Sequence, residues 1–307
     1  MIYKSLPSVI KRLRDDNVRA TIFNGDCRAL LGKIPSDSVD LIVTSPPYSI
    51  GKEYETNKNV DSFIELHEEI LPEVFRICKN GASICWQIGY HISKSNVLPL
   101  DYILFDIIRK LKLDFSLRNR IIWTFGHGLH AYSKFSGRHE MILWFTKGNN
   151  YQFNLDAVRI PQKYPGKRAS RGPNKGEFSG NPLGKNPSDV WEIPNVKANH
   201  IEKTAHPCQF PVAIPQRLIR ALTNKNDLVL DPFCGVASTG VAALLENRRF
   251  IGADLSMPYC EIGERRILEA ISGTARIRPL DREIHVPTPT SAVATKPDHF
   301  WKNKYTK

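Results

Sequence analysis

The residues best suited to chemistry lie in turns that follow apolar strands, and the first such turn is SPPY. It begins at Ser45, directly after the apolar run VDLIVT. Pro46 and Pro47 fix the backbone and end the strand. A planar base with an amino group could stack on Tyr48 and donate its NH2 hydrogens to the Ser45 hydroxyl and the Pro46 carbonyl. Taken alone, the motif is better explained as a rigid turn that only ends a strand.

The second turn is DPFCGVASTG, where a buried strand ends at Asp231 and a helix begins among small residues. Small residues let a ligand approach the backbone, and a helix N-terminus presents N–H groups to an anion. Asp254 ends the next strand, where an acid can accept hydrogen bonds from ribose hydroxyls. The pattern predicts a nucleoside-cofactor site, although it matches neither GxGxxG nor a P-loop. A structural turn packed with small residues is the alternative.

Together and in this order, the motifs resemble the DNA amino-methyltransferases that use S-adenosylmethionine. Their signatures are [DNS]PP[YFW] and a DPFxGSGTT-like turn, and the order seen here is that of the circularly permuted β class. The segments NGDC (24–27), NRIIWTFG…RHEMILWFTKG (119–148), DVWEIP (189–194) and HPCQFPVAIPQRLIRALT (206–223) agree as well. The resemblance covers about residues 19–270, apart from a variable insert.

The resemblance implies a role for each site residue. Ser45, Pro46, Pro47 and Tyr48 would hold the target base. Asp26 would face the adenine amino group of the cofactor and Asp254 its ribose, while His206 and Phe210 would help close the methionine end. The residues expected to form the cofactor turn are Asp231, Pro232, Phe233, Cys234, Gly235 and Ser238. The usual GSG is here Gly235-Val236-Ala237, so an extra methyl group is expected near the cofactor.

Ser rather than Asp at position 45 favours the N4 of cytosine as target, because within this family SPPY is commoner in N4-cytosine enzymes and DPPY in N6-adenine enzymes. N6-adenine is the alternative. More remote alternatives are an RNA or protein-glutamine N-methyltransferase, and a DNA-binding module that has lost catalysis. The family implies duplex DNA as partner, a restriction-modification system with a cognate endonuclease, and no metal.

Pro207-Cys208-Gln209 matches the PCQ nucleophile of enzymes that methylate carbon 5 of cytosine. Those enzymes also need an acid in an ENV motif, which this sequence lacks. Their PCQ follows the cofactor strand, whereas here it precedes it. We therefore do not expect Cys208 to act as a nucleophile.

The elements that position these turns alternate along the chain. Apolar runs predict strands over 20–26, 39–48, 82–89, 120–126, 140–148, 228–233 and 249–255. Helical periodicity marks 5–16, 62–81, 102–113, 210–223, 236–247 and 258–272. The alternation predicts an α/β fold, a mostly parallel sheet covered by helices on both faces, with ligands at the carboxyl ends of its strands. The resemblance adds a Rossmann-like methyltransferase fold with seven strands.

Residues 151–190 differ in composition from the rest of the chain. Between residues 159 and 185 there are seven basic residues and one acidic residue, Glu177. We expect an inserted target-recognition segment between two parts of the catalytic domain, 1–150 and 191–272. A solvated surface loop is the alternative. The cations expected to grip DNA phosphates are Lys163, Lys167, Arg168, Arg171 and Lys175. The Pro/Thr-rich tail, 273–307, should be an arm or disordered.

The composition of the chain limits the partners, the cellular location and the cysteine chemistry that we expect. The 307 residues carry a formal charge of +12, which suits a polyanionic partner. No run of 18 apolar residues and no signal-peptide core occur, so we expect a cytoplasmic protein without a membrane segment. The six cysteines form no CxxC pair or zinc-ligand cluster and should be reduced core residues. The oligomeric state, monomer or dimer, stays open.

Overall fold

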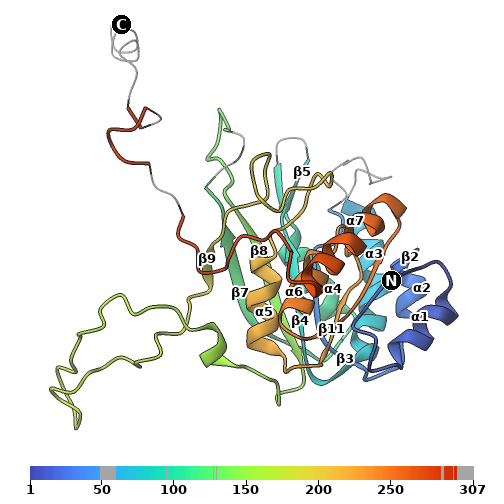
Figure 1. Ribbon diagram of the computed structural model, residues 1–307, viewed down its shortest axis with the longest axis horizontal. Helices are drawn as coiled ribbons and strands as arrows, with labels where there is room; N and C mark the ends of the chain where they lie inside the picture. The colour runs from blue at the N-terminus through green and yellow to red at the C-terminus, as the bar shows by residue number, and fades with distance from the viewer. Residues whose placement is uncertain are drawn as a thin grey trace, which may run out of the picture.

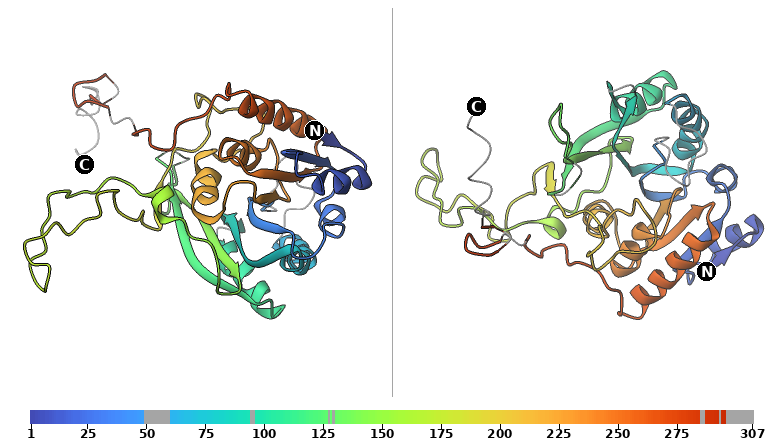
Figure 2. Two further views of the ribbon diagram at one scale, coloured as in Figure 1. Left: turned by 60° about the horizontal axis from the view of Figure 1, so that its bottom comes forward. Right: turned by 90° about the horizontal axis from the view of Figure 1, so that it is seen from above.

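The computed structural model describes residues 1–48, 60–93, 96–126, 128, 130–284, 287–292 and 294–295. One large sheet runs through the molecule, with helices on both of its faces (Figures 1 and 2). Its strands, in sheet order, are β1 (Ile2–Tyr3), β2 (Ala20–Asn24), β11 (Arg249–Asp254), β10 (Leu228–Asp231), β3 (Val39–Thr44), β4 (Cys78–Ile88), β8 (His139–Lys147), β7 (Phe115–Thr124) and β9 (Val190–Glu192).

The sheet is parallel from β1 to β4, and β8 is antiparallel to both of its neighbours. The seven strands from β2 to β7 are the predicted ones, and their mostly parallel arrangement confirms the α/β prediction. The expected count of seven is too low for the whole sheet, because β1 and β9 extend its two edges. These edge strands have only two and three residues, too few to show a period of two.

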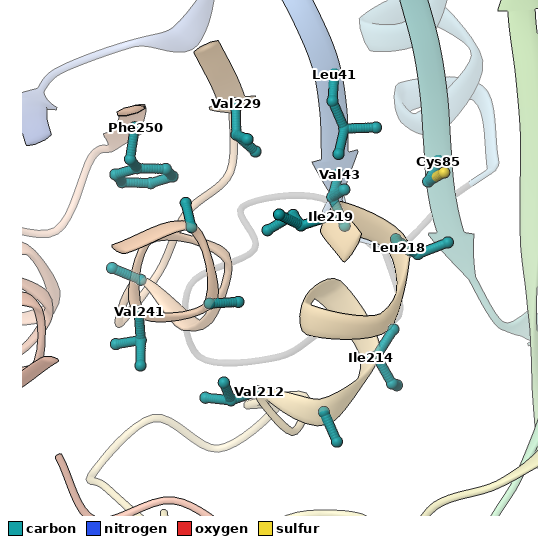
Figure 3. Packing of buried hydrophobic residues seen from close by; sticks show 14 of the residues in the cluster. Leu41, Val43, Cys85, Val212, Ile214, Leu218, Ile219, Val229, Val241 and Phe250 are labelled. Atoms are coloured by element: carbon teal, nitrogen blue, oxygen red, sulfur yellow. The ribbon is translucent and has the colours of Figure 1, made fainter. Parts of the chain in front are cut away.

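Helices cover each face of the sheet. They are α1 (Leu6–Leu13), α2 (Cys27–Leu31), α3 (Val60–Ile77), α4 (Leu100–Lys110), α5 (Ala213–Leu222), α6 (Ser238–Leu245) and α7 (Met257–Ile271). A small hairpin, β5 (Tyr90–Ser93) and β6 (Asn96–Pro99), was not predicted. Successive residues of a strand point to opposite faces of the sheet, so they belong to two separate hydrophobic cores. In β10, Val229 packs with α5 and α6, whereas its neighbours Leu228 and Leu230 pack with α1 to α4. Figure 3 shows the α5–α6 side, with Val43, Val229 and Phe250 among the packed side chains.

The insert leaves this body after a short 3-10 turn, η1 (Leu155–Val158), and projects away from it (Figure 1). It doubles back on itself through two isolated antiparallel bridges, Ile160 with Lys185 and Arg168 with Phe178. The start of the tail behaves differently, since Ala275, Ile277 and Leu280 pack against the core. The prediction for 296–307 lies outside the described residues.

Candidate active site

The two predicted turns meet at the point where the strand order of the sheet reverses. β10 pairs in parallel with β3, through Val229 with Leu41 and Leu230 with Ile42. From β10 the sheet continues to β11 and β2, and from β3 to β4. Ligands of open α/β sheets bind in the crevice outside the carboxyl ends of such a pair. SPPY and DPFCGVASTG both begin there, although more than 180 residues separate them in the chain.

Asp231 links the two turns through side-chain hydrogen bonds. Thr44 Oγ1 donates to Asp231 Oδ1 at 2.6 Å, and Thr239 Oγ1 donates to Oδ2 at 2.7 Å. The backbone N–H of Phe233 adds a third hydrogen bond at 3.1 Å. Burial raises the pKa of Asp231 to about 6 despite these donors. Because the side chain is fully buried, direct contact with the cofactor is not supported, and Asp231 acts as a clasp between β3 and α6.

Gly235, which is buried, and Asp254, which is half-buried, face each other at the cofactor turn. Gly235 has φ +50°, and a Cβ added there would lie 3.3 Å from Nε2 of His206, so a larger residue would be strained and would crowd this ring. Its N–H donates to Asp254 Oδ2 at 3.0 Å, and the N–H of Ser256 donates to Oδ1 at 2.8 Å. Burial raises the pKa of Asp254. The carboxylate is thus fixed at the end of β11, where a ribose would lie.

The extra methyl group of Ala237 does not face this turn, contrary to expectation. Ala237 is fully buried in the left-handed conformation, at φ 59° and ψ 42°. A Cβ added at Gly263 of α7 would lie 3.1 Å from the Ala237 methyl, which therefore points into the α6–α7 contact. The side chain of Cys234 is likewise buried, and Ser238 Oγ donates to the carbonyl of Phe210 at 2.9 Å. These residues can offer a ligand mainly their backbone.

The NGD segment lies beside the Asp254 strand, as the permuted order requires. Asn24 pairs with Asp254, and the N–H of Gly25 donates to the Asp254 carbonyl at 3.0 Å. Asp26 caps α2 by accepting from the backbone N–H of Arg28 at 2.9 Å. Its side-chain hydrogen bond with Arg28 lowers the pKa of Asp26. Its contact with an adenine amino group stays a prediction.

His206 lies against Gly235. That it helps to close the methionine end of the cofactor stays a prediction. The His206 ring meets Tyr259 edge-on, with 4.6 Å between centroids. Burial lowers the pKa of His206 to about 4, so the ring is neutral at pH 7. The adjoining Cys208 is exposed, while the buried Gln209 donates to the carbonyl of Glu202 at 2.8 Å. The PCQ motif lies in a loop. That Cys208 does not act as a nucleophile stays a prediction.

The SPPY turn has a buried backbone and partly open side chains. Pro46 is buried, while Ser45, Pro47 and Tyr48 are half-buried. Ser45 Oγ lies 3.4 Å from the phenol oxygen of Tyr48. The sequence analysis missed the partner of this phenol: Tyr48 hydrogen-bonds Glu140 at the start of β8. The only sign of this contact in the sequence was Glu140, an acidic residue at the start of an apolar strand.

Two surfaces can meet a polyanion. All five predicted insert cations are exposed, and Arg168 stacks over Phe178 at 4.2 Å. The second surface, which the sequence analysis missed, is the loop from β7 to β8. It projects from the same edge as the SPPY turn, and its Tyr132 and Phe135 are fully exposed. Among the described residues, none covers these two side chains.

Within the described residues, no cluster of His, Cys, Asp or Glu could hold a metal ion. A search of the same residues finds no helix with the length and apolar character needed to span a bilayer.

Comparison with known proteins shows that this chain belongs to the DNA methylase family. The family model described as DNA methylase matches residues 39–265. The type II methyltransferase M.BglII of Bacillus subtilis is 46% identical over 242 residues, which cover 78% of this chain and 67% of that protein. The DNA adenine methyltransferase YhdJ of Escherichia coli K12 is 35% identical over 260 residues, covering 83% of this chain and 84% of YhdJ.

Solved structures agree on the fold. The cytosine-N4-specific PvuII DNA methyltransferase has a TM-score of 0.64 at 19% identity, covering 83% of this chain and 92% of that one. TTHA0409 of Thermus thermophilus, in complex with S-adenosyl-L-methionine, has a TM-score of 0.59 at 25% identity, covering 83% and 97%. The sheet is thus that of the Rossmann-like methyltransferases.

Proposed function

As a member of the DNA methylase family, this chain uses S-adenosylmethionine, and we propose that it methylates the exocyclic N4 of cytosine in duplex DNA. The observation that carries the proposal is the Thr44–Asp231 hydrogen bond, which holds SPPY directly beside the cofactor turn. Ser45, in place of an Asp, favours cytosine as the base. N6-adenine is the second candidate, because YhdJ, a DNA adenine methyltransferase, is 35% identical to this chain.

The residues around the turn fit the cofactor. Asp254 is held at the strand end by two backbone N–H groups, which leaves lone pairs to accept from ribose hydroxyls. Gly235 lets a ligand approach the backbone where a Cβ would crowd His206. Asp26, at the N-cap of α2 just after the neighbouring strand β2, would accept from the adenine amino group. When bound, the cofactor supplies a methyl group on a positively charged sulfur.

The chain's own task is to prepare the amine of the base. An exocyclic amine is a poor nucleophile because its lone pair is delocalised into the ring. Acceptors at Ser45 Oγ and the Pro46 carbonyl would draw the amine toward a tetrahedral geometry and localise the lone pair for in-line attack. The proton leaves afterwards. Positioning and oriented hydrogen bonds supply most of the effect.

The base must leave the duplex to reach this turn. Extrusion costs a few kcal/mol, and stacking on Tyr48 would offset about 1–3 kcal/mol of it. We assign the grip on the duplex to the insert, whose exposed cations can meet phosphates, and to the β7–β8 loop with Tyr132 and Phe135. The similarity to M.BglII, a type II methyltransferase, supports a place in a restriction-modification system with a cognate endonuclease.

The test is to incubate purified protein with S-adenosylmethionine and plasmid DNA from a methylation-free host, and to identify the modified nucleoside by mass spectrometry. We expect N4-methylcytosine. N6-methyladenine would overturn the choice of base, and an unmodified plasmid would overturn the assignment as a DNA enzyme. Ser45→Ala and Tyr48→Ala should lose most of the activity, whereas Ser272→Ala at the end of α7 should keep it.

A further inference from the structure

We propose that Glu140 is a positioning residue that sets the direction of the hydroxyl groups in the SPPY turn. Tyr48 donates its phenol hydrogen to Glu140, its oxygen accepts from Ser45, and the Ser45 lone pairs are thereby turned toward the amine of the base. This inference rests on the proposed function and adds to it the residue that prepares the acceptor.

The surroundings of Glu140 show a site made to hold a carboxylate. Glu140 is the second residue of β8, and Gln87 at the end of β4 donates its Nε2 hydrogen to Glu140 Oε2. Tyr48 supplies the other side-chain hydrogen bond. Burying a carboxylate without a counter-charge is costly, and across the described residues no ion pair reaches Glu140. A purely structural position would be filled more cheaply by an apolar side chain.

Gly89 makes room for the contact. A Cβ added at Gly89 would lie 3.0 Å from the ring of Tyr48 and 3.6 Å from Glu140 Oε1. A side chain there would push the ring away from the carboxylate. The hydrogen bond between Tyr48 and Glu140 therefore lies where three segments meet: the backbone after β4, the start of β8 and the SPPY turn.

The direction of each hydrogen follows from what each group can do. An ionised carboxylate only accepts, so Gln87 and Tyr48 must both donate to Glu140. The phenol oxygen, its hydrogen committed, can then only accept from Ser45. The Ser45–Tyr48 distance of 3.4 Å is long for a hydrogen bond, as catalytic contacts often are before substrate binds. With its hydrogen directed at Tyr48, Ser45 faces the base as an acceptor.

Protonation of Glu140 would undo this order. A neutral carboxyl can donate to the phenol, which frees the phenol hydrogen to turn toward Ser45. Among the described residues, Tyr48 is the titratable side chain that acts on Glu140, with Gln87 as its other polar neighbour. Burial raises the pKa of Glu140 to about 6, so the change falls within reach of an activity assay.

The experiment compares wild type with Glu140→Gln, Tyr48→Phe and the double variant, each checked for folding by circular dichroism. Measurements are kcat and KM for DNA from pH 5 to 8.5, and cofactor affinity by calorimetry. We expect Glu140→Gln to lower kcat about tenfold at pH 8, with KM and cofactor affinity within twofold of wild type. The wild-type fall in kcat below pH 6 should be absent from this variant.

Tyr48→Phe keeps the ring and Glu140 but removes the hydroxyl, so it should lose the same acid limb, and adding Glu140→Gln should change kcat no further. Glu65→Gln, at an exposed position of α3, is the control and should behave as wild type. An acid limb that persists in both single variants, or rate losses that multiply in the double variant, would overturn the inference. The proposed function fails separately, if wild type methylates no DNA.

Discussion

Thr44→Val tests the clasp between the two turns. Thr44 is fully buried and its hydroxyl donates to Asp231 at 2.6 Å. Valine keeps the shape and the strand preference but removes the donor. A hydrogen bond to a charged group contributes about 1.5–3 kcal/mol, and the methyl group gained returns about 0.8 kcal/mol. The variant should therefore be less stable than wild type by about 1–2 kcal/mol at pH 8, where Asp231 is ionised.

The pH dependence makes the test specific. Asp231 has a pKa near 6 in the folded state against 3.8 as its ordinary value, so its ionisation lowers stability as pH rises through this range. Removing a donor raises the folded pKa further, and this added cost appears only when the carboxylate is ionised. At pH 5 the loss should shrink to well under about 1 kcal/mol.

The assay is urea unfolding followed by circular dichroism at pH 5 and pH 8. Thr124→Val is the control, because Thr124 Oγ1 donates to the carbonyl of Trp191, which does not titrate. Its effect should be the same at both pH values. An equal loss for Thr44→Val at pH 5 and pH 8 would refute the clasp.

Three further predictions concern binding. Neutralising the five insert cations should reduce the slope of log K against log salt for DNA by roughly 4–5, measured by fluorescence anisotropy at several salt concentrations. Ala237→Gly should leave cofactor affinity by calorimetry within twofold of wild type, because the methyl group faces α7; a larger change would contradict that placement. Tyr132→Ala with Phe135→Ala should weaken DNA binding without lowering Tm, since both rings are fully exposed, whereas a lower Tm would show a structural role.

The sequence was sufficient for the central strands, because each is a run of apolar residues bounded by turn signals. The order of SPPY and the Asp231 turn also predicted their meeting, since parallel strands place their carboxyl ends at one edge. The edge strands β1 and β9 were missed because two or three residues carry no periodicity. Their pairing depends on neighbours that are remote in the chain.

The motifs did not predict the direction in which the side chains of the site point. Asp231 was expected to face the cofactor, but Thr44 and Thr239 draw its carboxylate beneath the turn. Ala237 was expected near the cofactor, but its left-handed backbone turns the methyl group toward α7. Both outcomes depend on contacts between segments far apart in sequence, which a local pattern does not contain.

Taken together, the contacts hold the SPPY turn at both ends by carboxylates, of which Asp231 is fully buried and Glu140 is half-buried. Asp231 binds Thr44, just before the turn, and Glu140 binds Tyr48, at its end. Both carboxyls have pKa values raised to about 6 by burial. An acid with a raised pKa destabilises the folded state once ionised, and the two shifts together amount to roughly 5 kcal/mol lost as pH rises from below 4 to above 6.

The contribution of these two carboxyls to stability and their effect on activity should therefore change in opposite directions between pH 8 and pH 5.5. Burial lowers the pKa of His67 and His206 to about 4, and these rings act on stability in the other direction, so the prediction concerns the difference between wild type and Glu140→Gln. At pH 5.5 these two groups should add to the free energy of unfolding, while kcat falls because the hydroxyls of the turn lose their fixed direction. Urea unfolding and initial rates on the same preparations measure both quantities. Glu140→Gln should weaken both responses, because it removes one of the two titrations. A fall in kcat and a change in stability at pH 5.5 that are the same in wild type and Glu140→Gln would show instead that the Glu140 carboxylate does not control the turn.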